Sequence, residues 1–385
     1  MRAYSASAEE SVDARNLLKD WLAESFLTRE QYDRMEPDTA CDLRRTNIFL
    51  RVVLFLFTLI IVAAAAGLFF VLVLDRSSSQ STGVFLLVCA AASYASAEFA
   101  VSQFHLYRYG IEEALAVCSV GFLCGGLLAL LSSSTESLVP AAGILASLWI
   151  WHRFGLPYAF LAAMIFVIWL APYWTSSHSA QHTIVAVFYA TGLIAVIAAR
   201  PRDHSIVEAL LWLGIYLAIN LQLSSMDLLR QWWLGPASTT EFPRAFYWTT
   251  WVLTWLLPPA ILVRGILRKD RLVIAVGTIA ALLTLITNKP YLGWQRHTWD
   301  PMLLGALLIA TALLLRRWLA AAPNGIRHGF TAQRLSAKDK QWMSIGSAAL
   351  GLATPQAITP PHQPAAPGPH FGGGTSGGAG ASSDF

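Results

Sequence analysis

The sequence predicts an all-α fold, a polytopic helical bundle integral to a membrane, with about ten transmembrane helices. The chain is 55% hydrophobic and only 13% charged, which is about half the charged fraction of a typical soluble protein. Residues 47–74 contain one charged residue, Arg51, and as a helix they are long enough to cross a hydrocarbon core of about 30 Å. Further apolar runs follow at about 83–104, 111–131, 138–152, 156–173, 180–199, 205–225, 245–265, 271–287 and 299–319.

The chain divides into three segments. Residues 1–46 are mostly polar and are predicted to form a cytoplasmic helical hairpin. Residues 47–319 form the transmembrane helical bundle, and residues 320–385 are basic and then rich in Pro and Gly. Because such a composition cannot bury enough apolar surface to fold, we expect residues 320–385 to be a disordered cytoplasmic tail.

Two short helices are predicted for the N-terminal hairpin. Thr28 and Gln31 form a capping-box pattern that starts the second helix, and Pro37 ends it. The apolar residues of the first helix recur at helical spacing, which predicts an amphipathic helix, and they are Leu17, Leu18, Trp21 and Leu22. This apolar stripe either rests on the membrane surface or on the protein itself, or it docks a partner protein.

The basic residues indicate the orientation of the bundle. Arg44 and Arg45 stand just before the first span, so the positive-inside rule places the N-terminus in the cytoplasm. The fourth and fifth runs are short and joined by residues 152–155, so they are either two spans or a re-entrant pair, which would leave eight spans. Either count returns the C-terminus to the cytoplasm. The connections predicted inside carry Arg108, Arg153, Arg200, Arg202, Arg264, Arg268, Lys269 and Arg271.

Glu98 is the clearest candidate functional residue, because a carboxylate inside a span is costly unless it is paired, protonated or hydrated. Helical spacing places Tyr94, Glu98, Ser102 and His105 on one face, and Glu112 and Glu113 open the next span across a short turn. These groups would relay protons or bind a cation. Alternatively, Glu98 pairs with an arginine near the inner boundary, either Arg108 or Arg51, and has a structural role.

Glycine and proline mark two further features of the bundle. Gly121 and Gly125 form a Gly-x-x-x-Gly step, which predicts close helix packing in the third span. Pro258 and Pro259 lie inside the eighth span, where they would bend the helix or split it. Such breaks sometimes mark transporter binding sites, but the other half of the chain has no convincing match, so a kink without a substrate is the expectation.

Polar residues near the predicted outer side give weaker signals. His178 and His182 have the i, i+4 spacing of a metal-binding pair, but no third ligand or nearby acid is evident in the sequence, so we expect them to be surface histidines. Asn220, Gln222 and Asp227 either line a polar vestibule or approach water at the interface. We predict an interfacial helix within about 226–244.

The sequence contains no His-Glu-x-x-His motif, no Walker A motif and no Gly-x-Gly-x-x-Gly after a predicted strand. The Gly-x-Ser-x-Gly pattern occurs only within the Gly-rich ending, at residues 374–378, and so gives no sign of a catalytic serine. Asp75 stands where membrane glycosyltransferases that use polyprenyl-phosphate sugars carry an acidic residue in their first outer loop. The net charge of +4 is small and the basic residues are dispersed, which argues against a nucleic-acid partner. Because the sequence shows no cofactor-binding motif and no set of metal ligands, we predict no cofactor and no bound metal.

The segment Leu17-Leu-Lys-Asp-Trp21-Leu-Ala-Glu-Ser-Phe-Leu27-Thr-Arg-Glu-Gln31, followed by Arg44-Arg45 and a long first span, resembles a family of predicted bacterial multi-pass membrane proteins of unknown function. In that family a short cytoplasmic segment with a Trp and a Thr/Ser-x-Glu-Gln turn precedes about eight to ten helices. The Gly-rich ending resembles tails of bacterial envelope proteins. The resemblance implies a multi-pass protein of the bacterial inner membrane.

Three functions follow from these observations. The first is a non-enzymatic structural or accessory role in the membrane, with a protein partner or self-association through the hairpin. The alternative is a proton- or cation-coupled transporter or channel that uses Glu98, and the third is a glycosyltransferase that uses a polyprenyl-phosphate sugar.

Overall fold

The computed structural model describes residues 3–331 apart from 24, 45, 74–77, 133–134, 202, 228–241, 289–299, 322–325 and 328–329. The fold is all-α, with one short antiparallel pair of strands, β1 (Ile326–Arg327) and β2 (Phe330–Thr331). The described part of the predicted tail consists of residues 320, 321, 326, 327, 330 and 331, which include the end of the last helix and the two strands, so the expected disorder does not hold there. The rest of the predicted tail, residues 228–241 of the predicted interfacial helix, and Asp75 lie outside the described residues.

The predicted N-terminal hairpin is present. It consists of α1 (Ala6–Ala23), α2 (Arg29–Met35) and a single 3-10 turn, η1 (Pro37–Thr39). The capping box is formed as expected, because the Gln31 amide N–H donates to the Thr28 hydroxyl while the Gln31 side chain accepts from the Thr28 N–H. Arg15 of α1 donates to Glu36 at 2.7 Å, which joins the two helices.

Within the described residues, ten long helices follow the hairpin, one for each predicted apolar run, although the seventh ends at Ile219 and not at residue 225 as predicted. They are α3 (Ile48–Val73), α4 (Ser79–Phe104), α5 (Ile111–Leu130), α6 (Leu138–Phe154), α7 (Pro157–Trp174), α8 (His178–Ala199), α9 (His204–Ile219), α11 (Arg244–Arg268), α12 (Arg271–Asn288) and α13 (Asp300–Ala320).

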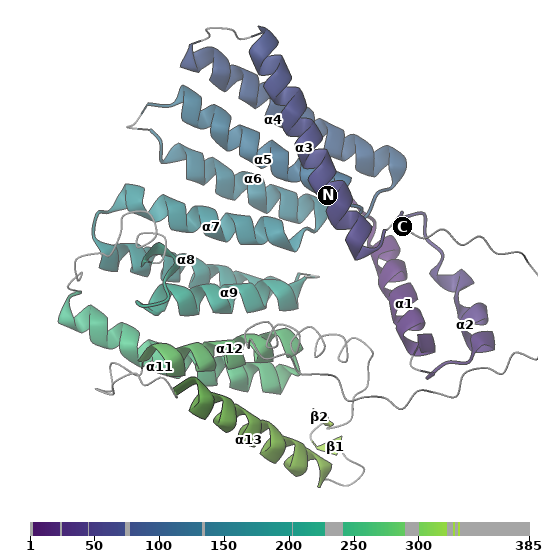
Figure 1. Cartoon of the computed structure of the whole chain (residues 1–385), viewed down its shortest axis with the longest axis vertical. Helices are drawn as coiled ribbons and strands as arrows, with labels where there is room; N and C mark the ends of the chain where they lie inside the picture. The colour runs from purple at the N-terminus through teal and green to yellow at the C-terminus, as the bar shows by residue number, and fades with distance from the viewer. Residues whose placement is uncertain are drawn as a thin grey trace, which may run out of the picture.

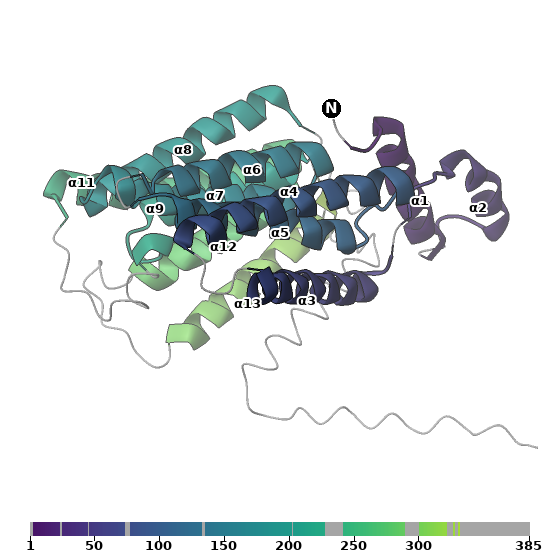
Figure 2. The same cartoon turned by 90° about the horizontal axis from the view of Figure 1, so that it is seen from above.

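The helices α4 to α9 lie side by side in chain order, and α11 and α12 pack against α9 (Figure 1). Consecutive helices run antiparallel, so the connections alternate between two ends of the bundle. Helix α3 crosses this row obliquely and packs mainly on α5, and α13 lies at the other edge (Figures 1 and 2). The hairpin stands at the end where α4 finishes and α5 begins, and we call this the hairpin end (Figure 1).

Six of these helices are long and apolar enough to cross a membrane, by length and composition, and they are α3, α4, α5, α7, α8 and α11. Helices α6, α9 and α12 are apolar but shorter. Large apolar side chains of α3 face outward, and Phe57 and Ile60 are 61% and 63% exposed. Such surfaces are unfavourable in water and favourable against lipid. These properties are those of a membrane protein.

The buried core has two parts. The first lies between α7, α8 and α9 and includes Met164, Tyr189 and Leu211. The second joins the N-terminal segment to α4, α5, α6 and α7, and it includes Tyr4 and Ile150. Tyr4 and Val12 therefore pack the N-terminal segment and α1 on the protein itself, whereas only Leu18 of the predicted apolar stripe is buried, and Leu17 and Trp21 are exposed.

Of the two glycines predicted to pack closely, Gly125 lies against α4 and Gly121 does not. A Cβ atom at Gly126 of α5 would lie 3.0 Å from the carbonyl oxygen of Gly83 on α4, so a larger residue would be tightly crowded where these two helices approach. Gly125 would make only an ordinary contact with Leu86, and Gly121 would meet nothing within 4 Å. The tightest contact of α5 with α4 is therefore at Gly126, one residue after the end of the Gly-x-x-x-Gly step.

The two prolines do not divide the eighth helix. Helix α11 continues from Arg244 to Arg268 through Pro258 and Pro259. Thr254, one turn before Pro258, donates its hydroxyl to the carbonyl of Thr250 at 2.7 Å. The split-helix alternative is therefore excluded, and with it the resemblance to a transporter with broken helices loses its basis.

Candidate functional site

The described polar groups gather at two places, one at the hairpin end and one near the opposite end. We define the hairpin-end cluster as Glu98, Arg153, Arg51, Glu112 and Glu113, and the distal cluster as His182, Asp227, Asn220, Tyr216 and Thr284. The first contains three of the five predicted site residues, Glu98, Glu112 and Glu113. The second was seen in the sequence only as isolated polar positions.

Glu98 of α4 is bound by an arginine of α6. Arg153, in the last turn of α6, donates Nε to Glu98 Oε1 at 2.6 Å and Nη2 to Oε2 at 2.9 Å. Tyr94 donates its hydroxyl to Oε1 at 2.9 Å, and Trp149 donates to the Tyr94 hydroxyl at 2.8 Å. Such a two-bond arginine pair neutralises the carboxylate and fixes its orientation.

The predicted partners of Glu98 are therefore wrong, although pairing with an arginine was foreseen. Arg51 binds another carboxylate, as described below, and Arg108 lies over the Tyr107 ring at 5.4 Å. Glu98 and Arg153 both retain 25% side-chain exposure. The pair lies at the edge of the bundle and joins α4 to α6.

Ser102 and His105 do not join Glu98 in a common site. Ser102 is exposed and donates to the carbonyl of Phe99 in its own helix. His105 is exposed and ends α4 in the left-handed conformation, with φ of 53°. The predicted relay of carboxylate and imidazole along one helix face is therefore not assembled, because the helix ends before His105 completes that face.

The two glutamates that open α5 are buried and have different partners. Glu113 pairs with Arg51 of α3, whose Nε donates to Oε2 at 2.9 Å. Glu112 accepts the Tyr109 N–H at 2.6 Å, in the first turn of a helix where a negative charge is favourable. Gly110, with φ of 107°, permits this turn, since a Cβ there would lie 2.3 Å from the Arg51 carbonyl.

The N-terminal segment covers this cluster. The Ala3 N–H donates to the Arg153 carbonyl at 2.8 Å, and the Tyr4 hydroxyl donates to the Leu106 carbonyl at 2.9 Å. The Tyr4 ring packs edge-on against Tyr107, with centroids 4.9 Å apart. Burial, together with the nearby Glu112 carboxylate, raises the pKa of the Tyr4 phenol well above its usual range.

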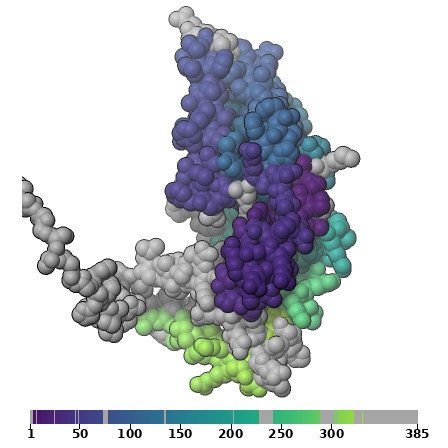
Figure 3. Space-filling model, turned by 90° about the vertical axis from the view of Figure 1, so that its right-hand side faces the viewer, coloured from purple at the N-terminus to yellow at the C-terminus, as the bar shows by residue number. Residues whose placement is uncertain are grey.

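A second connection ties the same loop to the chain before α3. Arg44 and Leu106 form an isolated parallel bridge, with the Arg44 N–H donating to the His105 carbonyl at 2.9 Å and the Tyr107 N–H donating to the Arg44 carbonyl at 3.0 Å. The loop between α4 and α5 is thus held from both sides. Figure 3 shows α1 and α2 lying across the end of the molecule that faces the viewer.

A third ion pair lies at the hairpin end, between α9 and α11. Glu208 is 3% exposed and accepts from Arg264 Nε at 2.6 Å. His204, one turn earlier on α9, lies 2.7 Å from its other carboxylate oxygen. This pair was missed in the sequence. The sequence did contain a sign of it. Glu208 lies near the start of α9 and Arg264 near the end of α11, and in antiparallel helices these two positions lie at the same depth in the bundle.

The distal cluster is centred on His182, which is only 1% exposed. Its Nδ1 lies 2.6 Å from the Ala218 carbonyl oxygen, and its Nε2 lies 3.0 Å from Asp227 Oδ2. The expectation of a surface histidine without a nearby acid is therefore wrong. The chain folds back after α9, and this brings Asp227 beside α8.

Hydrogen bonds extend from the distal cluster into the bundle. Asn220 donates to the Tyr216 hydroxyl at 2.9 Å and to the Thr287 hydroxyl at 3.3 Å, and the hydroxyls of Tyr216 and Thr284 are 2.8 Å apart. Asn220 is 3% exposed. Of the three predicted vestibule residues, Asn220 is thus buried in a network between α9 and α12, and Asp227 contacts His182.

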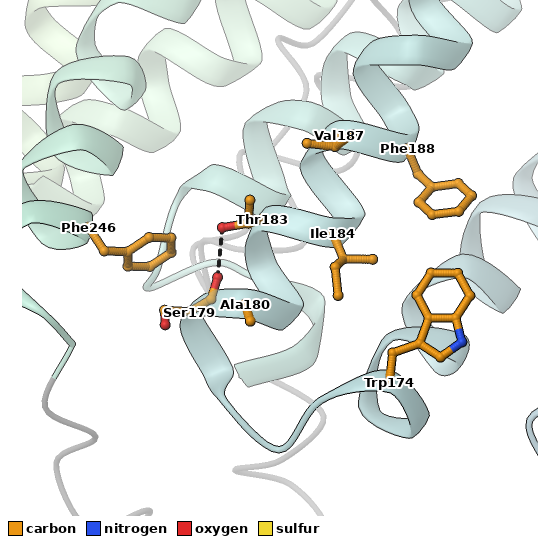
Figure 4. A pocket seen from close by; sticks show the side chains of 8 residues that line it. All are labelled: Trp174, Ser179, Ala180, Thr183, Ile184, Val187, Phe188 and Phe246. Carbon is orange, nitrogen blue, oxygen red and sulfur yellow. Dashed lines mark hydrogen bonds between the residues drawn. The ribbon is translucent and has the colours of Figure 1, made fainter.

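An apolar groove of about 470 Å³ opens beside the distal cluster, between α8, the end of α7 and α11 (Figure 4). The aromatic rings stand at its two sides, and the Thr183 hydroxyl donates to the Ser179 carbonyl at 2.8 Å. Its walls offer few polar groups to a ligand. The groove is lined by Trp174, Ser179, Ala180, Thr183, Ile184, Val187, Phe188 and Phe246.

Among the described residues, no group of three His, Cys, Asp or Glu side chains is placed to hold a metal ion. The four cysteines are unpaired with one another. Compared with protein-family models, with curated proteins and with solved structures, the chain finds no match. The resemblance to a bacterial multi-pass family stays a prediction from the sequence.

Proposed function

We propose that the protein is a non-enzymatic structural or accessory component of the bacterial inner membrane, and that its N-terminal hairpin is the surface that binds a protein partner. The hairpin-end cluster is the observation that supports this most. Glu98 and Glu113 are bound by arginines, one carboxylate oxygen of Glu112 accepts a backbone N–H, and the N-terminal segment is fixed over them. A site built in this way is a rigid support for the hairpin.

We further propose that all ten helices cross the membrane, with both termini in the cytoplasm. Helix α6 has 17 residues and α7 has 18, lengths of about 25–27 Å at 1.5 Å per residue, close to the hydrocarbon thickness of about 30 Å. They also pack along one another, which favours two spans over a re-entrant pair. Antiparallel order puts the basic connections at the hairpin end, as the positive-inside rule requires.

The hairpin offers an apolar face that its own protein leaves uncovered. Leu17 and Trp21 stand one turn apart on α1 and are 46% and 39% exposed, whereas Leu18 is 4% exposed and belongs to the hairpin core. Exposed aromatic and aliphatic side chains at i, i+4 spacing are the usual anchors by which a helix binds a groove. The partner is a protein with such a groove, or a second copy of this chain.

Photo-cross-linking in intact cells tests this proposal. A photoreactive residue at position 17 or 21 is expected to give the same discrete product, because both positions share one face of α1. The matched control is position 19, where the exposed Lys19 lies on the opposite face. Lipid adducts alone, or equal products from position 19, would contradict a specific protein partner.

Proton- or cation-coupled transport through Glu98 is the alternative proposal. The pair with Arg153 weighs against it, because a carboxylate bound through both oxygens must first lose an arginine before it can carry a proton. Flux into proteoliposomes should therefore be the same for the wild type and for Glu98→Gln. A flux that Glu98→Gln abolishes in the folded protein would favour transport. Glycosyl transfer rests only on Asp75 and gains no support from the described residues.

A further inference from the structure

The histidine of the distal cluster faces two hydrogen-bond acceptors. His182 Nδ1 lies 2.6 Å from the Ala218 carbonyl, and Nε2 lies 3.0 Å from an Asp227 carboxylate oxygen. A neutral imidazole has one N–H donor and one acceptor nitrogen, and a carbonyl oxygen can only accept. Nδ1 must therefore carry the proton of a neutral ring in order to donate to the Ala218 carbonyl. Nε2 then has no proton and faces the Asp227 carboxylate.

The contact at Nε2 requires one further proton. A carboxylate also accepts only, so a neutral ring and an ionised Asp227 would place two lone pairs 3.0 Å apart. This arrangement is repulsive, and burial strengthens the repulsion because water does not screen it. One proton on Nε2 turns the repulsion into a charge-assisted hydrogen bond.

We propose that His182 and Asp227 form a proton-binding site, which holds the segment after α9 against α8 when it is occupied and loosens that segment when the proton leaves. The proton is taken up on Nε2, so the occupied site is an imidazolium paired with a carboxylate. This function goes beyond partner binding by the hairpin, because it lies near the opposite end of the bundle.

The surroundings of the ring favour a site for a proton over one for a metal ion or an organic ligand. The rings of Phe242 and Phe246 lie 6.0 and 6.3 Å from the His182 ring, and among the described residues His182 and Asp227 belong to no group of three side chains that could hold a metal ion. Asp227 is 18% exposed and gives the proton a route to water, whereas His182 is 1% exposed. On the parts of α8, α9 and α11 nearest this ring, the other titratable or charged groups are His178, Tyr189, Tyr216, Arg244 and Tyr247, whereas His204, Glu208, Arg264 and Arg268 lie at the hairpin end.

The segment that this site holds is the turn that follows α9. Helix α9 ends at Ile219, and the Asn220 side-chain oxygen accepts the N–H groups of Gln222 and Leu223 at 3.1 and 3.3 Å. His182 contacts both sides of this turn, through Ala218 before it and Asp227 after it. Loss of the proton from Nε2 removes the hydrogen bond to Asp227 and leaves the hydrogen bond to the Ala218 carbonyl.

Nitrogen NMR of histidine-labelled protein in nanodiscs tests the protonation state directly. His182→Gln identifies the signal of His182, and His152→Gln, at an exposed histidine of the hairpin end, is the matched control. We expect a doubly protonated imidazolium at the acid end of the range from about pH 5 to 8, where histidine is able to change its charge. A neutral His182 throughout this range would overturn the proposal.

Asp227→Asn separates the proton from the geometry. The amide of this variant has the shape of the carboxyl group and can donate an N–H to Nε2, so the ring should stay neutral and the segment should stay held at every pH. Hydrogen exchange of residues 218–227 should therefore match that of Asp227→Asn at acid pH and become several-fold faster in the wild type at alkaline pH. Equal hydrogen exchange in the wild type and in Asp227→Asn at all pH values would refute the proposal that the proton holds this segment. This test does not depend on whether His182→Gln folds.

Discussion

The pair between Glu98 and Arg153 gives the most quantitative prediction. Arg153→Met removes the guanidinium but keeps an unbranched side chain that can still pack, so the Glu98 carboxylate loses the two hydrogen bonds from Arg153. Removing one partner of a fully buried pair costs about 3–5 kcal/mol, and an exposed pair contributes at most about 1 kcal/mol. Because both side chains are 25% exposed, we expect a loss of about 2 kcal/mol in the free energy of unfolding.

A double-mutant cycle isolates the pair from other effects of the substitution. Glu98→Gln removes the charge and keeps an oxygen that can accept from Tyr94, so Arg153→Met should cost much less in this background. We expect a coupling energy of about 1–2 kcal/mol, measured by reversible unfolding of the protein in mixed micelles and followed by circular dichroism.

Arg268→Met is the control for this cycle, since Arg268 is an exposed arginine at the same end of the bundle and its loss should change stability by no more than about 0.5 kcal/mol. A coupling energy below about 0.5 kcal/mol would refute the reasoning. In that case Glu98 would not depend on Arg153, and its availability for proton or cation transport would have to be considered again.

Three further predictions follow from described contacts. Gly126→Ala should destabilise the bundle by about 1–3 kcal/mol, because its Cβ would meet α4, whereas Gly121→Ala should be neutral or slightly stabilising in the same unfolding assay. The hydrogen bond from Arg15 lowers the pKa of the Glu36 carboxyl group below its usual range. The pair therefore stabilises the hairpin at pH values above the pKa of an unpaired glutamate, and this stabilisation is lost as the pH falls through the lowered pKa. Arg15→Gln should remove this pH dependence of hairpin stability, measured by NMR of α1 and α2. Tyr4→Phe should weaken the attachment of the N-terminal segment by about 1 kcal/mol, seen as faster hydrogen exchange there.

The helices were predictable from the sequence because each is recorded in local composition. An apolar run of about twenty residues has few alternatives to a helix, and the ten runs recur as ten helices. The capping box at Thr28 and Gln31 was equally local, since its two hydrogen bonds join residues three positions apart. Features of this kind need no knowledge of how distant segments pack.

Contacts between helices were predicted less well, because they depend on rotation and register. Glu98 was expected to contact the nearest arginines in sequence, yet it binds Arg153, which lies 55 positions along the chain. Gly126 rather than Gly121 faces α4, a difference of five residues that turns the helix by about 140°. Composition indicates that a glycine face exists, but it does not say which glycine meets the neighbour.

His182 shows why local sequence failed near the opposite end of the bundle. A histidine beside serines at a helix start is typical of an exposed position, and the acid that faces it is 45 positions away. The fold-back after α9 brings the two together, and it depends on the Asn220 side chain. The spacing of His178 and His182 directed attention to a metal pair, although the relevant partner of His182 was Asp227.

The size of the assembly extracted from the native membrane tests the central proposal most directly. The wild-type protein should migrate as a complex that contains a partner protein or a second copy, and the double variant Leu17→Ser with Trp21→Ser should migrate as the single chain with its detergent. Lys19→Ser, on the opposite face of α1, should leave the complex intact. A wild-type protein that has the same mass as the double variant would contradict a hairpin that binds a partner.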